Sequence, residues 1–176
     1  MWSIKKEFDF CYGHRVWSQT LDTDYATDSC LKCRHLHGHQ GKVIVELQAS
    51  VLKDGMVTDF KHLSWFKKWI DDVLDHKFIM DINDPLFTHE VPTIPPSEIL
   101  WDEQGIGTVP DYEIKNVTPV IWEKYEGMVF VNFVPTSENL CKFLFDIVNR
   151  KMINLGIGTK SVQFYETPKS QSIYSI

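Results

Sequence analysis

Residues 42–52 read KVIVELQASVL, and apolar side chains occupy every second position along them. These positions are Val43, Val45, Leu47, Ala49 and Val51. Side chains two residues apart point to the same face of a β-strand, so the alternation is typical of a strand with one buried face. The segment therefore predicts a half-buried strand, and the chain is limited to folds that cover one face of a sheet.

Two other segments have the period of an amphipathic helix. In residues 59–78 the apolar side chains recur at three- and four-residue steps; they are Phe60, Leu63, Phe66, Ile70, Val73 and Leu74. Asp59 is well placed as the N-cap of this helix. Residues 135–156 predict a second helix, with Thr136 as its cap and Gly156 at its end. Its expected buried stripe consists of Leu140, Leu144, Ile147, Val148 and Leu155.

Further strands are expected near both ends of the chain, at residues 4–14, 160–167 and 172–176. The segment at about 81–134 holds six of the eight prolines and little helical period. We interpret it as an irregular insertion that ends in a strand, GMVFVNFV. The order of elements predicts one α+β domain over residues 1–176.

Composition excludes several classes of function. The formal net charge of -6 argues against general nucleic-acid binding, which requires a basic face. No apolar run approaches the length of a membrane span, and no apolar stretch follows the first lysines as in a signal peptide. With four cysteines and no secretory signal, we expect a reducing, cytoplasmic location, where clustered Cys and His bind metals or act in catalysis.

The stretch SCLKCRHLHGH contains two cysteines and three histidines. His37 and His39 flank Gly38, and in an extended chain they point to the same face, so two imidazoles can reach one ion. In one interpretation they form a structural zinc site with Cys30 and Cys33. In a second, a distant third histidine completes an open site and a cysteine stays free. In a third, these histidines are solvated and bind no metal.

Six stretches occur in the order FDFCYGHRV, CRHLHGHQGKV, DGMVTDF, LDHKF, PTSENL and YETP. With them the chain resembles the 6-pyruvoyltetrahydropterin synthase family, and within it the 6-carboxytetrahydropterin synthases of the queuosine (7-deazaguanine) pathway. The resemblance spans nearly the whole chain except the insertion. It implies a tunnelling fold, which is an antiparallel four-stranded sheet with two helices inserted between its strand pairs. It also implies self-association, usually a homohexamer of two trimers whose sheets form barrels.

The resemblance assigns roles to seven residues of this sequence. The zinc ligands of the family match His14, His37 and His39, and this match favours the three-histidine site. The catalytic residues of the family match Cys33, Asp75 and His76. Its pterin-anchoring glutamate matches Glu166.

The implied reaction converts 7,8-dihydroneopterin triphosphate to 6-carboxy-5,6,7,8-tetrahydropterin, with release of acetaldehyde and triphosphate. Two alternatives remain open at the level of the sequence. One is a 6-pyruvoyltetrahydropterin synthase, which eliminates triphosphate, and the other is a non-catalytic, zinc-stabilised binding module. The expected partners are the pterin triphosphate and further copies of the chain, but neither nucleic acid nor a membrane. The insertion of roughly fifty residues departs from the family pattern, and the roles of Cys11, Cys30 and His35 are not assigned.

Overall fold

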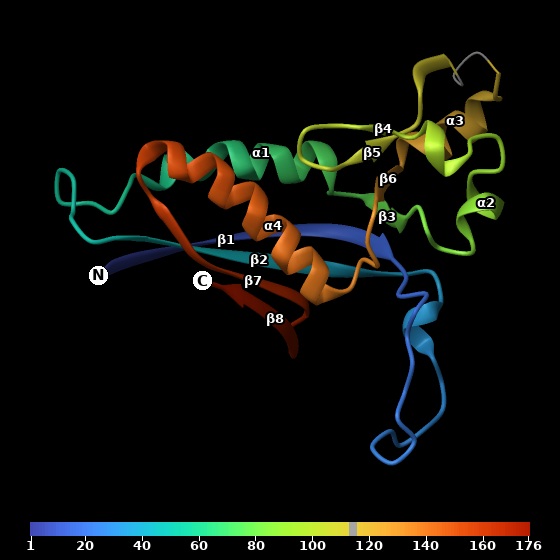
Figure 1. Cartoon of the computed structure of the whole chain (residues 1–176), viewed down its shortest axis with the longest axis horizontal. Helices are drawn as coiled ribbons and strands as arrows, with labels where there is room; N and C mark the ends of the chain where they lie inside the picture. Colours follow the sequence, from blue (N-terminus) through green and yellow to red (C-terminus); the bar gives the residue numbers. More distant parts are fainter. Residues whose placement is uncertain (113–115) are drawn as a thin grey trace. The chain divides into compact units, whose positions relative to one another are not determined.

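Two long strands, β1 (Trp2–His14) and β2 (His37–Ala49), run through both compact units of the chain. The computed structural model describes residues 1–112 and 116–176. The first unit comprises Met1–Cys11, His39–Asp75 and Ser137–Ile176, and the second comprises Tyr12–Gly38 and His76–Thr136. Figure 1 labels the elements along the chain.

In the first unit, β2 pairs antiparallel with β7 (Gly158–Thr167), and β7 pairs antiparallel with β8 (Ser170–Ser175). The predicted alternation in β2 is confirmed for Val43, Val45 and Leu47, which are fully buried. Val51 is 77% exposed, because the strand ends at Ala49 and the alternation no longer applies beyond it.

Two helices supply the apolar layer of the first unit, as predicted. They are α1 (Ser64–Val73) and α4 (Ser137–Met152), and α4 packs on β7 and β8 (Figure 1). Aromatic rings connect α1 to β1, since the ring centroids of Phe8 and Phe66 lie 5.1 Å apart, edge to face.

The first predicted helix is shorter than expected. Asp59 does act as a cap, but it caps the 3₁₀ helix η2 (Phe60–Leu63), where its side chain accepts a hydrogen bond from the Lys61 amide. A 3₁₀ helix has three residues per turn, so Phe60 leaves the apolar stripe and is half exposed. The predicted stripe is confirmed at Leu63, Phe66, Ile70 and Leu74.

The stripe of α4 is confirmed at Leu140, Leu144, Ile147 and Val148. Leu155 is 56% exposed, contrary to the prediction, because α4 ends at Met152 and the 3₁₀ helix η5 (Ile153–Leu155) changes the phase. Met152 is fully buried in its place. Gly156 ends the segment in the left-handed conformation, with a φ of 71°, as expected of a glycine that terminates a helix.

The second unit contains several short elements within the segment that we interpreted as an irregular insertion. Its strands β3 (Lys77–Asp81) and β6 (Met128–Val131) are parallel neighbours, and β6 confirms the predicted terminal strand. Two short strands, β4 (Leu100–Trp101) and β5 (Gly107–Thr108), continue from β6. The unit also contains the helices α2 (Phe87–Glu90) and α3 (Pro119–Glu126) and the 3₁₀ helix η3 (Pro96–Glu98).

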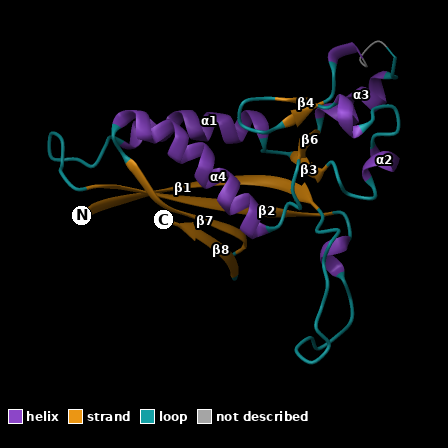
Figure 2. Ribbon diagram, in the orientation of Figure 1, coloured by secondary structure: helices purple, strands orange, loops and turns teal. Residues whose placement is uncertain are grey.

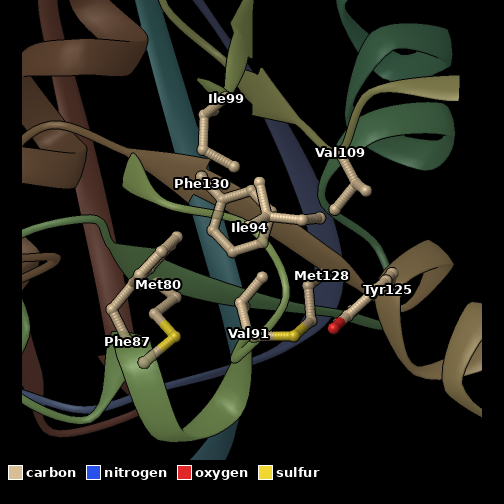
Figure 3. Close-up of a cluster of buried hydrophobic side chains, with 9 residues drawn as sticks. All are labelled: Met80, Phe87, Val91, Ile94, Ile99, Val109, Tyr125, Met128 and Phe130. Carbon is tan, nitrogen blue, oxygen red and sulfur yellow. The ribbon is translucent and has the colours of Figure 1, made fainter. Parts of the chain in front are cut away.

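A separate hydrophobic cluster holds the second unit together (Figure 3). It consists of Met80, Phe87, Val91, Ile94, Ile99, Val109, Tyr125, Met128 and Phe130. The sequence shows no period over this segment because these side chains come from many short elements and loops. None of these elements is long enough to show a period in the sequence.

The hydrogen-bonded order of strands is β4-β5-β6-β3-β1-β2-β7-β8. The fold is α+β, as predicted, but the expected four-stranded antiparallel sheet is corrected to a mixed sheet. Strands β1, β2, β7 and β8 are the four that the sequence predicts, and β3 pairs with β1 in parallel, Tyr12 opposite Lys77. Within the described residues, no helix is long and apolar enough to cross a membrane.

Candidate active site

Three histidines gather where β1 ends and β2 begins. His14, His37 and His39 each offer one ligand atom, and these atoms all lie within 4.8 Å of one another. His14 is buried, and the other two are half-buried. Since β2 begins at His37, the extended backbone assumed for the His-Gly-His sequence is confirmed. These residues could hold a metal ion.

Backbone carbonyl groups orient two of the imidazoles. The Nδ1 atom of His14 lies 2.7 Å from the carbonyl oxygen of Pro135, and Nδ1 of His37 lies 2.8 Å from that of His35. A carbonyl oxygen only accepts, so each Nδ1 carries the hydrogen and donates it. In a neutral imidazole the lone pair is then on Nε2. Neutral imidazoles fixed through their second nitrogen are the usual ligands of Zn²⁺, so the donor set fits that ion.

The two cysteines of the motif are not part of this group. Cys30 is exposed and Cys33 is half-buried. This arrangement favours the open three-histidine site over a structural site with cysteine ligands.

Glycines allow the backbones to approach closely at this point. A Cβ atom on Gly38 would lie 2.8 Å from the carbonyl oxygen of Tyr12, and one on Gly13 would lie 2.6 Å from Cδ2 of Phe78. Both positions therefore favour glycine, and the need for Gly13 was missed in the sequence. The carbonyl groups of His35 and Pro135 were also missed, since a backbone group leaves no signal in the residue type.

Cys33 lies in the 3₁₀ helix η1 (Lys32–Arg34), inside the long connection from β1 to β2. Its amide donates to Oε1 of Gln19 at 3.0 Å, and its carbonyl oxygen accepts from the Val16 amide at 2.7 Å. Both backbone groups of the cysteine are thus held by the residues that follow His14.

Asp75 and His76 follow the end of α1. The Oδ1 atom of Asp75 accepts a hydrogen bond from the Cys11 amide at 2.8 Å, which attaches this carboxylate to β1. His76 is exposed and has a φ of 59°. That conformation is uncommon for a residue with a side chain, and such outliers concentrate at functional sites. The orientation of His76 by Asp75 stays a prediction.

Glu166 is half-buried near the end of β7. The pairing of β7 with β8 shifts between Tyr165 and Thr167, so Glu166 is the extra residue of a β-bulge. Bulges re-aim side chains and are frequent next to active sites. The alternation of side chains along β7 is therefore interrupted at Glu166. Cys33 and His76 belong to the second unit, and Asp75 and Glu166 belong to the first. The position of each of these residues is therefore described relative to its own unit.

Comparison with known proteins identifies the family. Residues 3–175 match the family model described as 6-pyruvoyl tetrahydropterin synthase. The chain belongs to this family. A relative in Aquifex aeolicus named 6-carboxy-5,6,7,8-tetrahydropterin synthase is 31% identical over 185 residues, which cover 98% of this chain and 97% of the relative.

Two solved structures share the fold. The crystal structure of an uncharacterized protein from Wolinella succinogenes is 52% identical, has a TM-score of 0.96, and matches over 99% of this chain and 97% of the other. The 6-pyruvoyl tetrahydropterin synthase of Caenorhabditis elegans has a TM-score of 0.56 at 21% identity, over 99% of this chain and 94% of the other. At that identity the likeness shows the fold alone.

Proposed function

We propose that this member of the family converts 7,8-dihydroneopterin triphosphate to 6-carboxy-5,6,7,8-tetrahydropterin, with release of acetaldehyde and triphosphate. The observation that carries the proposal is the group of three histidines, which leaves Cys33 outside the ligand set. The name of the Aquifex relative, which matches over nearly the full length of both chains, supports the choice of product.

The three histidines would hold Zn²⁺ through neutral imidazoles. The ion would act as a Lewis acid on the side-chain hydroxyl groups of the substrate. His14 and His37 would present their Nε2 atoms for this purpose, since their Nδ1 hydrogens are donated to backbone carbonyl groups.

Cys33, as a thiolate, would remove a proton from the reacting side chain of the substrate. Its position is fixed through its own backbone, by Val16 and Gln19. His76 would exchange protons with the same substrate side chain, while the carboxylate of Asp75 would orient it. Glu166 would accept hydrogen bonds from the N–H groups of the pterin ring, a charged two-point contact that holds a planar heterocycle.

We also propose that the protein assembles as a homohexamer. The sheet order ends at β8 on one side and at β4 on the other, and exposed edges of this kind need to be covered. Light scattering should therefore give a mass of about six times the 20.6 kDa of one chain. A monomer at working concentration would contradict the assembly. The cytoplasmic location stays a prediction.

Mass analysis of the product formed from 7,8-dihydroneopterin triphosphate tests the function. The expected products are the 6-carboxy compound and acetaldehyde. A 6-pyruvoyl product would assign the chain to the alternative synthase, and no product with the zinc-loaded protein would support a binding module. As an internal control, Cys33→Ala should bind zinc but lose roughly 10²–10⁴-fold in turnover, the usual contribution of a proton-transfer group. Cys30→Ala should lower turnover far less than Cys33→Ala does.

A further inference from the structure

The residues that follow His14 contact Cys33 on one side and the start of the segment at about 81–134 on the other. We call residues 15–19 the 15–19 segment; Figure 2 shows it at the start of the loop between β1 and β2. Toward η1 it makes three hydrogen bonds. Two of them hold Cys33 itself, through Val16 and Gln19, and in the third Nε of Arg34 donates to the Trp17 carbonyl oxygen at 2.8 Å.

On its other side the 15–19 segment contacts two buried carboxylates. The indole Nε1 of Trp17 donates to Oδ2 of Asp81 at 2.9 Å, and Nε of Arg15 lies 3.0 Å from Oδ2 of Asp84. Asp81 is 2% exposed and Asp84 is 4% exposed. Asp81 is the last residue of β3, and its other oxygen accepts from both the amide and the side chain of Asn83. The anchors of the segment are therefore themselves held in place.

The ion pair between Arg15 and Asp84 is a poor source of stability. Burial raises the pKa of the Asp84 carboxyl group, although the Leu86 amide and the charge of Arg15 act in the opposite direction. A buried pair whose desolvation exceeds its attraction contributes little to folding free energy. What the pair does provide is a fixed geometry for the backbone of the 15–19 segment.

We propose that Trp17 and Gln19 are positioning residues for the Cys33 thiol. Asp81, through Trp17, and Asp84, through Arg15, fix the 15–19 segment to which they belong. The inference rests on the proposed function in so far as Cys33 is catalytic. Reacting groups must be held within a fraction of an ångström, and a misplacement of 1 Å can cost about a hundredfold in rate. Residues 81–84, at the start of the segment that departs from the family pattern, thereby act on the reaction without touching the substrate.

The test uses the reactivity of Cys33, because this readout does not depend on the substrate. Cys11→Ser and Cys30→Ser remove the two exposed thiols. Half-buried Cys33 and buried Cys141 then remain. In this background, Trp17→Phe removes the indole donor and Gln19→Leu removes the acceptor for the Cys33 amide. Tyr125→Phe is the matched control, since it removes one part-buried hydrogen bond, to Thr93 at 3.1 Å, elsewhere in the same unit.

We expect both test variants to change the rate of Cys33 alkylation by iodoacetamide roughly five- to tenfold, the factor that corresponds to one lost hydrogen bond. They should lower kcat roughly tenfold or more while KM changes less than about twofold. Both test variants should keep the zinc content of the wild type. The Tyr125→Phe control should match the wild type in alkylation rate, kcat and zinc content. If Trp17→Phe does not fold, as judged by circular dichroism, Gln19→Leu decides the question alone.

Two results would overturn the proposal. One is an alkylation rate and a kcat in both variants that match those of Tyr125→Phe. The other is a loss of zinc that accounts for the loss of kcat, which would show that the 15–19 segment acts on His14 rather than on Cys33. If the wild-type protein forms no pterin product, the proposed function fails, and the alkylation rates still decide whether Trp17 and Gln19 position Cys33.

Discussion

A Cβ atom on Gly38 would lie 2.8 Å from the carbonyl oxygen of Tyr12. The contacting atom is backbone, so no side chain can rotate away to relieve the overlap. We predict that Gly38→Ala separates the end of β1 from the start of β2. It should reduce the zinc content measured by metal analysis and lower the free energy of unfolding by about 1–3 kcal/mol, as overpacking does.

Gly158→Ala is the control for this variant. A Cβ atom there would lie 3.5 Å from the side chain of Gln48, an ordinary van der Waals distance. It should bind zinc like the wild type. Equal zinc contents in the two variants would show that the close approach at Gly38 is not needed for the site.

The second prediction concerns the ligands. The double variant Cys30→Ala with Cys33→Ala should retain about one zinc ion per chain, because three histidines suffice for an open site. His14→Ala should lose the metal, whereas His89→Ala should not, because His89 is an exposed residue of α2 outside the group of three histidines. Loss of zinc from the double cysteine variant would instead support a structural site.

Much of this site can be predicted from the sequence because its residues lie in short, local patterns. The spacing of His37 and His39 in an extended strand predicts a shared ion. By contrast, the Pro135 carbonyl that orients His14 is 121 residues away, and only the folded chain brings them together. The cluster around Phe130 gives no signal of this kind in the sequence, because it is assembled from elements too short to show a period.

The third prediction concerns the backbone at His76, whose φ is 59°. In the left-handed region a Cβ atom costs roughly 1–2 kcal/mol, and glycine avoids this cost. His76→Gly should therefore be more stable than His76→Ala by about 1 kcal/mol in denaturant unfolding. Both variants should lose activity, because the imidazole is the proposed proton-exchange group.

Asp54 provides the comparison for His76. It has a φ of 52°, lies in an exposed turn, and has no proposed role in the reaction. Asp54→Gly should likewise be more stable than Asp54→Ala, with turnover unchanged in both. A His76→Gly variant that keeps wild-type turnover would remove the imidazole from the mechanism.

The fourth prediction is a dependence of stability on pH. Burial raises the pKa of the Glu46 carboxyl group, but hydrogen bonds from Lys160, Ser3 and Ser161 and the charge of Lys5 lower it, with a net value of about 2. Because the pKa is below its usual value of 4.5, Glu46 stabilises the fold fully above pH 4.5 and loses this contribution as the pH falls toward 2.

Denaturant unfolding of Glu46→Gln checks this effect. At pH 7 the variant should be less stable than the wild type by up to about 3 kcal/mol, and the difference should shrink as the pH falls from 4.5 toward 2. Glu7→Gln, which breaks an exposed ion pair with Lys42, should change the stability much less, because solvent screens such pairs. A difference for Glu46→Gln that is constant with pH would show that the carboxylate is not stabilised in the folded state.

The last prediction concerns Glu166, the extra residue in the bulge of β7. If its carboxylate anchors the pterin ring, Glu166→Gln replaces an acceptor of two N–H bonds by an amide that brings donors of its own. A charged hydrogen bond contributes about 1.5–3 kcal/mol, so the affinity for the substrate should fall roughly 10- to 150-fold. Zinc content and oligomeric mass should not change, since Glu166 is neither a ligand nor buried in the core.

Glu123→Gln, on the exposed surface of α3, is the control for Glu166→Gln and should bind the substrate like the wild type. Calorimetric titration with a dihydropterin measures these affinities, and a value for Glu166→Gln within about twofold of wild type would mean that the bulge does not aim this carboxylate at the substrate.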